Sequence, residues 1–229
     1  MFEEIIFSDP IVTYIFFVLS YAILGGGIKY IDDAFDEKTF SVNKALLLAP
    51  ILGVFWAYLM SLHAASATIL LAIVLAVLLK GKIDNIAHQA GLVGIIGVVL
   101  VSGYFEFIWL GLIVITIAGI LDEVGNDYVD RKDLYGKGDI ISKIIHYFFE
   151  YRFTMKLAVF AFAFAGFYDW VYFLAFIGFD IAYVELTWYS LYLKNLSNFT
   201  YRQRNGNHLE RIVNGRNGTN KDSGRLTEA

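Results

Sequence analysis

The run IVTYIFFVLSYAILGGGI, residues 11–28, decides the fold, because it carries no charged side chain and is long enough to cross a bilayer as a helix. Hydrophobic residues make up 58% of the chain, against about 45–50% in an ordinary soluble domain. Similar apolar runs recur at about residues 44–62, 65–80, 88–103, 104–121, 154–168 and 170–193. The predicted fold is therefore all-α, a polytopic transmembrane helical bundle of about seven spans.

Glycines stand at two places that matter for these runs. Gly103 is the only break between the fourth and fifth runs, so a re-entrant segment is the alternative to two separate spans there. The triplet Gly25-Gly26-Gly27 ends the first run without a nucleotide-loop pattern. It predicts that another helix packs closely against the first span.

The positive charges indicate the orientation of the bundle. All 18 Lys and Arg residues fall within four segments: 29–44, 80–88, 122–156 and 194–229. Cytoplasmic loops of membrane proteins carry such an excess of Lys and Arg. We therefore expect an integral protein of the cell (cytoplasmic) membrane with its N-terminus outside and its C-terminus inside.

Composition divides the chain into two parts. Residues 1–196 form the predicted transmembrane bundle, whereas residues 197–229 are rich in Arg, Asn, Gly, Ser and Thr, which predicts a disordered basic cytosolic tail. Within the bundle, apolar residues recur at helical spacing between Ile140 and Phe149. This spacing predicts an amphipathic surface helix, which would act either as a lid or as an interfacial stabiliser.

Two short acidic stretches read almost alike. The first Asp motif, residues 32–38, is DDAFDEK, and the second Asp motif, residues 126–132, is NDYVDRK. Carboxylates three residues apart lie on one face of a helical turn and can share a divalent cation such as Mg²⁺. One such pair alone is usually an ordinary solvated surface feature. The repetition on spans of the same direction favours a joint site for metal and a polyanion such as diphosphate.

These motifs resemble those of the UbiA-type intramembrane prenyltransferases, which carry two Asp-rich motifs on cytosolic hairpins. The resemblance implies that Mg²⁺ and an isoprenyl diphosphate bind here, and that the prenyl group passes to a lipophilic acceptor. It implies metal-binding and catalytic roles for Asp33, Asp36, Asp127 and Asp130. Substrate contacts are expected from Asp32, Asn126, Lys80, Lys82, Arg131 and Lys132. The family usually has more spans, and its longer motif has a third Asp where this chain has Phe40 and Leu134.

Two carboxylates inside the last apolar run, Asp180 and Glu185, do not follow from that resemblance. Carboxylates within a span are costly unless they are paired or face a polar cavity. They are candidates for an acceptor or proton site, unless the run is tilted or broken and one of them sits near an interface. Two other functions remain open: a cation transporter or channel with an acidic cytosolic vestibule, and a non-enzymatic membrane scaffold.

Overall fold

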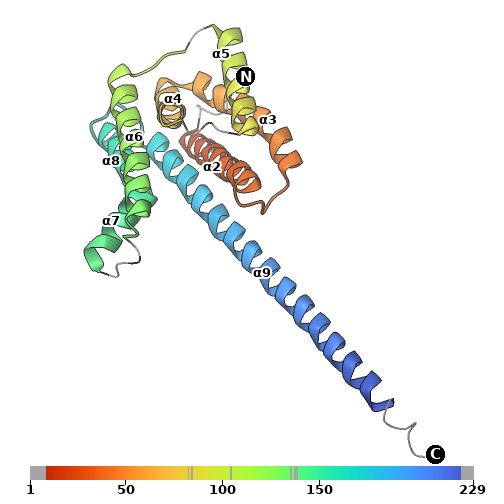
Figure 1. The fold of residues 1–229 in the computed structure, drawn as a ribbon. Coiled ribbons are helices and arrows are strands. Elements are labelled where there is room, and N and C mark those ends of the chain that lie inside the picture. The colour runs from red at the N-terminus through yellow and green to blue at the C-terminus, as the bar shows by residue number, and fades with distance from the viewer. Residues whose placement is uncertain are drawn as a thin grey trace, which may run out of the picture. The chain divides into compact units, whose positions relative to one another are not determined.

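The computed structural model describes residues 9–81, 83, 85–103, 105–134, 136 and 139–222, with side chains as far as residue 196. Within these residues the chain forms eight helices and no strand (Figure 1). The helices are α2 (Pro10–Phe35), α3 (Val42–Leu62), α4 (Ala64–Leu79), α5 (Ile86–Ser102), α6 (Trp109–Arg131), α7 (Ile140–Glu150), α8 (Phe153–Phe164) and α9 (Trp170–Asp222). The all-α fold is thus confirmed for the described residues.

Each predicted apolar run overlaps one helix, but the helices differ in length. Four are long and apolar enough to cross a membrane: α2, α3, α6 and the part of α9 from Trp170 to Leu196. The other three, α4, α5 and α8, have 16, 17 and 12 residues. At 1.5 Å per residue, α8 is only about 18 Å long, whereas the hydrocarbon core of a bilayer is about 30 Å thick.

Large apolar side chains lie exposed along the candidate spans. Leu47 of α3 is 71% exposed and Trp109 of α6 is 70% exposed. Many exposed apolar residues of this kind are unfavourable in water and favourable against lipid tails. Burial and length together support a membrane protein.

Local chemistry explains where several helices begin and end. Asp9 accepts a hydrogen bond of 2.8 Å from the amide of Ile11, and Pro10 occupies the first turn of α2. Gly103 adopts φ 69° and ends α5, a left-handed conformation that glycine tolerates best. The next helix begins at Trp109, a few residues inside the fifth predicted run, which was placed at about residues 104–121.

Glycines allow close helix contacts at two places. A Cβ added at Gly25 would lie 2.0 Å from the carbonyl oxygen of Phe179, so α2 and α9 touch backbone to backbone there. A Cβ added at Gly53 would lie 2.1 Å from the carbonyl oxygen of Gly91, which brings α3 equally close to α5. The predicted close packing at the glycine triplet is confirmed.

Helix α6 is the centre of the second half of the bundle, where it packs against α4, α7 and α8 (Figure 1). The predicted helix near residues 140–150 is confirmed as α7, and its Phe149 ring lies against Gly125 of α6. Helix α6 continues to Arg131, so the second Asp motif lies on the last turns of a helix.

The chain divides into two compact units, residues 1–187 and 188–229. Helix α9 continues without a break to Asp222, beyond residue 196 where the predicted bundle ends. The division into a bundle and a disordered basic tail stays a prediction.

Candidate site at the ends of α2 and α6

The first Asp motif places one carboxylate in the protein interior. Asp33, with a side chain only 3% exposed, forms an ion pair of 3.0 Å with Lys29, one turn earlier on α2. Its second oxygen, Oδ2, is buried without a hydrogen-bond partner among the described residues. Asp36 caps the end of α2 and is exposed. Asp33 therefore retains an acceptor oxygen that the fold itself does not use.

Asp32 connects α2 to two other helices. Its Oδ1 lies 2.9 Å from Nε2 of His88 on α5, and its Oδ2 accepts a hydrogen bond of 3.2 Å from the hydroxyl of Tyr183 on α9. The Asn85 side chain lies 2.8 Å from Nδ1 of His88 and also accepts from the His88 amide. With the Asn85 amide group donating to Nδ1, the ring proton is on Nε2 and faces Asp32.

Tyr183 lies between two cations that the sequence did not single out. Lys29 Nζ is 5.3 Å from the centroid of its ring, and the guanidinium of Arg152 is 5.1 Å away. Both distances suit cation–π attraction. Arg152 also forms an ion pair of 3.3 Å with Glu123 of α6. Tyr183 and Arg152 thus link the first Asp motif to the turn of α6 that precedes the second.

The surroundings of Arg152 keep it charged. Burial alone would lower the pKa of its guanidinium, because desolvation penalises the charged form. Four nearby groups outweigh burial and raise that pKa above its ordinary value: Tyr183, Glu123, Asp180 and Asp32. The positive charge between the motifs is therefore permanent.

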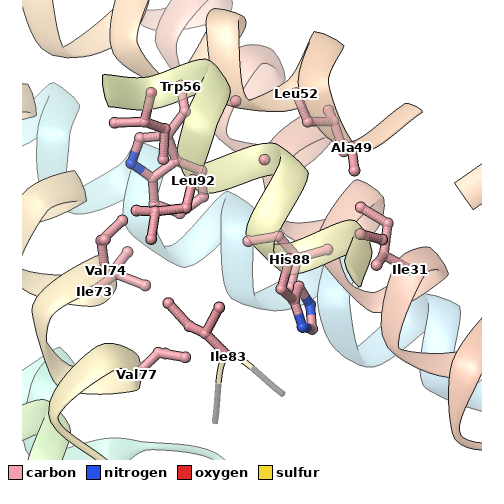
Figure 2. Close-up of a pocket in the computed structure, with 15 residues that line it drawn as sticks. Ile31, Ala49, Leu52, Trp56, Ile73, Val74, Val77, Ile83, His88 and Leu92 are labelled. Atoms are coloured by element: carbon pink, nitrogen blue, oxygen red, sulfur yellow. The ribbon is translucent and has the colours of Figure 1, made fainter. Parts of the chain in front are cut away.

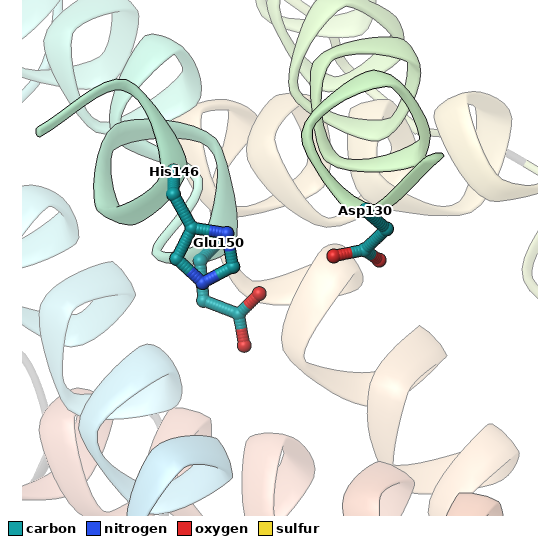
Figure 3. Close-up of side chains that lie close together, drawn as sticks. All are labelled: Asp130, His146 and Glu150. Carbon is teal, nitrogen blue, oxygen red and sulfur yellow. The ribbon is translucent and has the colours of Figure 1, made fainter. Parts of the chain in front are cut away.

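The two aspartates of the second Asp motif lie beside different helices. Asp127 Oδ2 lies 3.0 Å from Nζ of Lys80, at the end of α4. Asp130 instead lies with His146 and Glu150 of α7, and one ligand atom from each falls within 4.8 Å of the others (Figure 3). Among the described residues this is the only group of three or more such side chains that could hold a metal ion. The structure does not gather Asp33, Asp36, Asp127 and Asp130 into one such group.

The other residues that were predicted to contact the substrate differ in their surroundings. Arg131 donates to the carbonyl oxygen of Asp127 at 3.0 Å, and Lys132 is the exposed C-cap of α6. Asn126 has a buried side-chain oxygen without a hydrogen-bond partner among the described residues. Lys82 lies outside the described residues.

The two carboxylates of the last run also differ. Asp180 forms an ion pair with Lys156 of α8, so it is neutralised within the bundle. Glu185 is exposed. The structure therefore gives Asp180 a partner that the sequence did not predict. The only sequence signal was that Lys156 and Arg152 stand four residues apart at the start of an apolar run, where a cation needs a partner.

The residues that flank the connection between α4 and α5 contact both Asp motifs. Lys80, at the start of the connection, pairs with Asp127, and His88, in the first turn of α5, pairs with Asp32. Comparison with protein-family models, with curated proteins and with solved structures finds no match to this chain. The chemistry of the site is therefore argued from its residues.

Proposed function

We propose that this protein binds an isoprenyl diphosphate together with Mg²⁺ at the ends of α2 and α6, and transfers its prenyl group to a lipophilic acceptor. The observation that carries the proposal is the bridge formed by the end of α4 and the first turn of α5. Lys80 and His88, only eight residues apart, each contact a different Asp motif. Each motif thus has a carboxylate beside a hydrogen-bond donor, Lys80 at one and His88 at the other, which are the groups that a complex of metal and diphosphate requires.

The donor set fits Mg²⁺, which prefers carboxylate oxygens. Asp33 supplies a buried oxygen without a partner, and Asp127 supplies a carboxylate that is 38% exposed. Each of these side chains would hold a metal ion at its own motif, and this positive charge would neutralise the diphosphate as the allylic C–O bond breaks. Asp36 and Asp130 remain proposed as additional ligands at the outer ends of the motifs.

The chain's own cations would bind and orient the leaving group. Lys80 and Arg152 carry fixed positive charge beside the two motifs, and Lys29 lies beside Asp33. When the allylic C–O bond breaks, its electron pair stays with the diphosphate, whose growing negative charge these groups stabilise. The acceptor then forms the new bond to the prenyl carbon and loses a proton.

The same proposal includes the membrane arrangement: seven spans, an outside N-terminus and a site on the cytoplasmic side of the cell membrane. The distribution of Lys and Arg supports it. The exposed apolar faces of the four long helices support contact with lipid.

The alternative of a cation transporter has less support, because three of the four buried acids among the described residues are already paired with cations, and the fourth, Asp122, accepts from two backbone amides. Asp33 pairs with Lys29, Glu123 with Arg152 and Asp180 with Lys156. A pathway for bare cations needs carboxylates with net negative charge. Paired acids suit a ligand that brings both a metal and an anion.

The experiment is calorimetric binding of geranylgeranyl diphosphate to the full chain in nanodiscs, with and without Mg²⁺. We expect Mg²⁺-dependent binding that is lost in Asp33→Asn and in Asp127→Asn. Glu106→Gln is the matched control, because this exposed acid lies between α5 and α6, on the loop away from both motifs. Binding that ignores Mg²⁺, or that persists in both variants, overturns the proposal. Geranylgeraniol, which lacks the diphosphate, should bind without any Mg²⁺ dependence.

A further inference from the structure

Helix α7 contacts α6 with one of its sides. The Phe149 ring lies against Gly125 of α6, and His146 and Glu150 lie beside Asp130 near the end of α6 (Figure 3). None of the eleven residues of α7 is buried, so this helix packs on the surface of the bundle. The three α7 residues named here define its side toward α6.

The opposite side of α7 is apolar and exposed. Ile140, Ile141 and Ile144 are 76%, 70% and 62% exposed, and we call them the apolar face of α7. At 3.6 residues per turn, Ile140 lies about 180° around the helix from Phe149, and Ile144 about 160° from His146. The apolar face therefore points away from α6. Water is an unfavourable surrounding for three adjacent isoleucines, and a helix this short is marginal in water without packing.

The apolar face of α7 continues into an exposed stripe on α8. The ring of Phe148, one turn after Ile144, stacks on the ring of Phe153 with centroids 5.7 Å apart. Only residues 151 and 152 separate the two helices, so α7 is held at the start of α8. Exposed apolar residues then recur at helical spacing along α8: Phe153, Leu157, Phe160 and Phe164. The same surrounding that covers this stripe thus reaches α7.

Helix α6 shows the level of the membrane at which α7 lies. Helix α6 is one of the candidate spans, and every exposed residue from Trp109 to Tyr128 is apolar. From Asp130 onward the exposed residues of α6 are charged. Helix α7 contacts α6 at Gly125 and lies beside Asp130, so it lies across this change from apolar to charged surface. Such a change is expected where the hydrocarbon core meets the headgroups.

The apolar face of α7 is not a lid for the interior cavity of the bundle. That cavity, of about 120 Å³, lies between α2, α3, α4 and α5, and Ile31, Leu52 and Leu92 are among the residues that line it (Figure 2). Helix α7 contributes no residue to its lining. The described part of the chain also leaves the three isoleucines exposed. Whatever covers them comes from outside the described residues.

We propose that α7 lies in the bilayer interface, with its apolar face inserted at the boundary between phospholipid headgroups and acyl chains. An amphipathic helix binds this boundary through the apolar area that it buries there. Its two charged side chains, Lys143 and Glu150, have opposite signs, so the contact does not require anionic headgroups. The inference goes beyond the proposed function, since this contact needs neither Mg²⁺ nor diphosphate.

The test uses nitroxide labels on single cysteines, because the chain has no cysteine of its own. Ile144→Cys places the label in the apolar face, and Lys143→Cys is the matched control, about 100° around the helix. Leu157→Cys, on the exposed stripe of α8, is the lipid reference. The full chain is placed in phosphatidylcholine nanodiscs. Electron paramagnetic resonance then compares collisions with oxygen, which concentrates among acyl chains, and with a neutral nickel complex, which stays in water.

The expected result is a difference between neighbouring positions. The ratio of oxygen to nickel collisions should be several-fold higher at position 144 than at position 143, and close to the ratio at position 157. Nanodiscs that also contain phosphatidylglycerol should give the same ratios, because the contact is apolar.

Hydrogen exchange provides a second measurement that needs no label. Ile144→Ser removes apolar area from the face and should make the amides of α7 exchange several-fold faster in nanodiscs. Lys143→Ser introduces the same serine one position away and should leave this exchange unchanged. Equal effects of the two variants would show that the apolar face does not hold α7 in place, which overturns the inference.

Two labelling results would also overturn the inference. Frequent nickel collisions at position 144 would place the apolar face in water. Shielding of position 144 from both probes would mean that protein, such as a second copy of the chain, covers it. Position 157 separates the causes, because nickel collisions there as well would contradict the membrane arrangement as a whole. No isoprenyl diphosphate is present, so the outcome is independent of diphosphate binding.

Discussion

Lys80 Nζ lies 3.0 Å from Asp127 Oδ2, across 47 residues of sequence, and this ion pair fixes the start of the α4–α5 connection to the second Asp motif. Both side chains are partly exposed, so the pair itself adds little stability, about 0–1 kcal/mol. The ion pair matters for the position of the Lys80 side chain. A cation is held beside a carboxylate that a metal-bound diphosphate could reach.

Replacing Lys80 should therefore affect ligand binding more than folding. We expect Lys80→Met to weaken Mg²⁺-dependent geranylgeranyl diphosphate binding about tenfold, because hydrogen bonds to charged groups contribute about 1.5–3 kcal/mol. The unfolding temperature should change little. Calorimetry and thermal unfolding check the two parts, and Lys44→Met, an exposed lysine at the start of α3, is the control. Equal losses in both variants would mean that Lys80 has no specific role.

Asp33→Ala should destabilise the protein strongly. The change leaves Lys29, only 16% exposed, without its partner, and breaking a buried ion pair costs about 3–5 kcal/mol. The double variant Lys29→Met/Asp33→Leu removes both charges and should recover most of the loss. Thermal unfolding in one detergent measures all three proteins. If the double variant is no more stable than Asp33→Ala, the ion pair is not the cause.

Asp122→Ala should destabilise the start of α8. The buried Asp122 carboxylate accepts from the amides of Thr154 at 3.0 Å and Met155 at 2.8 Å, so it caps a helix from another helix. Loss of a cap costs about 0.5–2 kcal/mol. Hydrogen exchange should show faster exchange at the first turn of α8, with α4 unchanged. Asp122→Asn retains one acceptor oxygen and should lose less.

His63 should make stability depend on pH. It begins α4, and its Nδ1 accepts from the Ala65 amide at 3.2 Å, which requires an unprotonated nitrogen. Burial lowers its pKa, against smaller opposing effects of Asp169 and Glu106. The unfolded chain therefore binds the proton more readily. Its contribution is fully present above the unfolded pKa of about 6.5 and is lost as the pH falls through the lower folded pKa.

The measurement for His63 is the unfolding temperature between pH 7.5 and pH 5. His63→Asn is the comparison, because asparagine caps a helix without titrating in this range. The wild-type protein should lose more stability than the variant as the pH falls. Parallel pH profiles for the two proteins would show that His63 does not titrate on unfolding.

The helices could be predicted from the sequence because apolar runs of bilayer length leave few alternatives. The start of α6 was placed too early, since three of the four residues 105–108 are apolar but precede the helix, and Gly103 alone did not show where it begins. Composition showed which runs are apolar. The runs at 65–80, 88–103 and 154–168 were already the three shortest, and the corresponding helices α4, α5 and α8 are shorter than the four candidate spans.

The candidate site was predicted only in part. Local spacing identified the two Asp motifs, but it could not show that Asp130 turns toward α7 while Asp127 faces Lys80. Tyr183 and Arg152 had no local signal, because their importance depends on which helices are neighbours. Partners from distant helices are set by packing, which single-sequence patterns do not contain.

The cap that Asp122 provides has a consequence for the segment between α6 and α8, which contains α7. The Asp122 side chain of α6 accepts hydrogen bonds from amides in the first turn of α8. The start of α8 is therefore fixed by this contact with α6, and not by the number of residues that separate it from Arg131. Glu123, the next residue, holds Arg152 just before that start. A change in the number of residues between Arg131 and α7 should therefore leave the Arg152 guanidinium in place, because both of its neighbours on this side are held by α6.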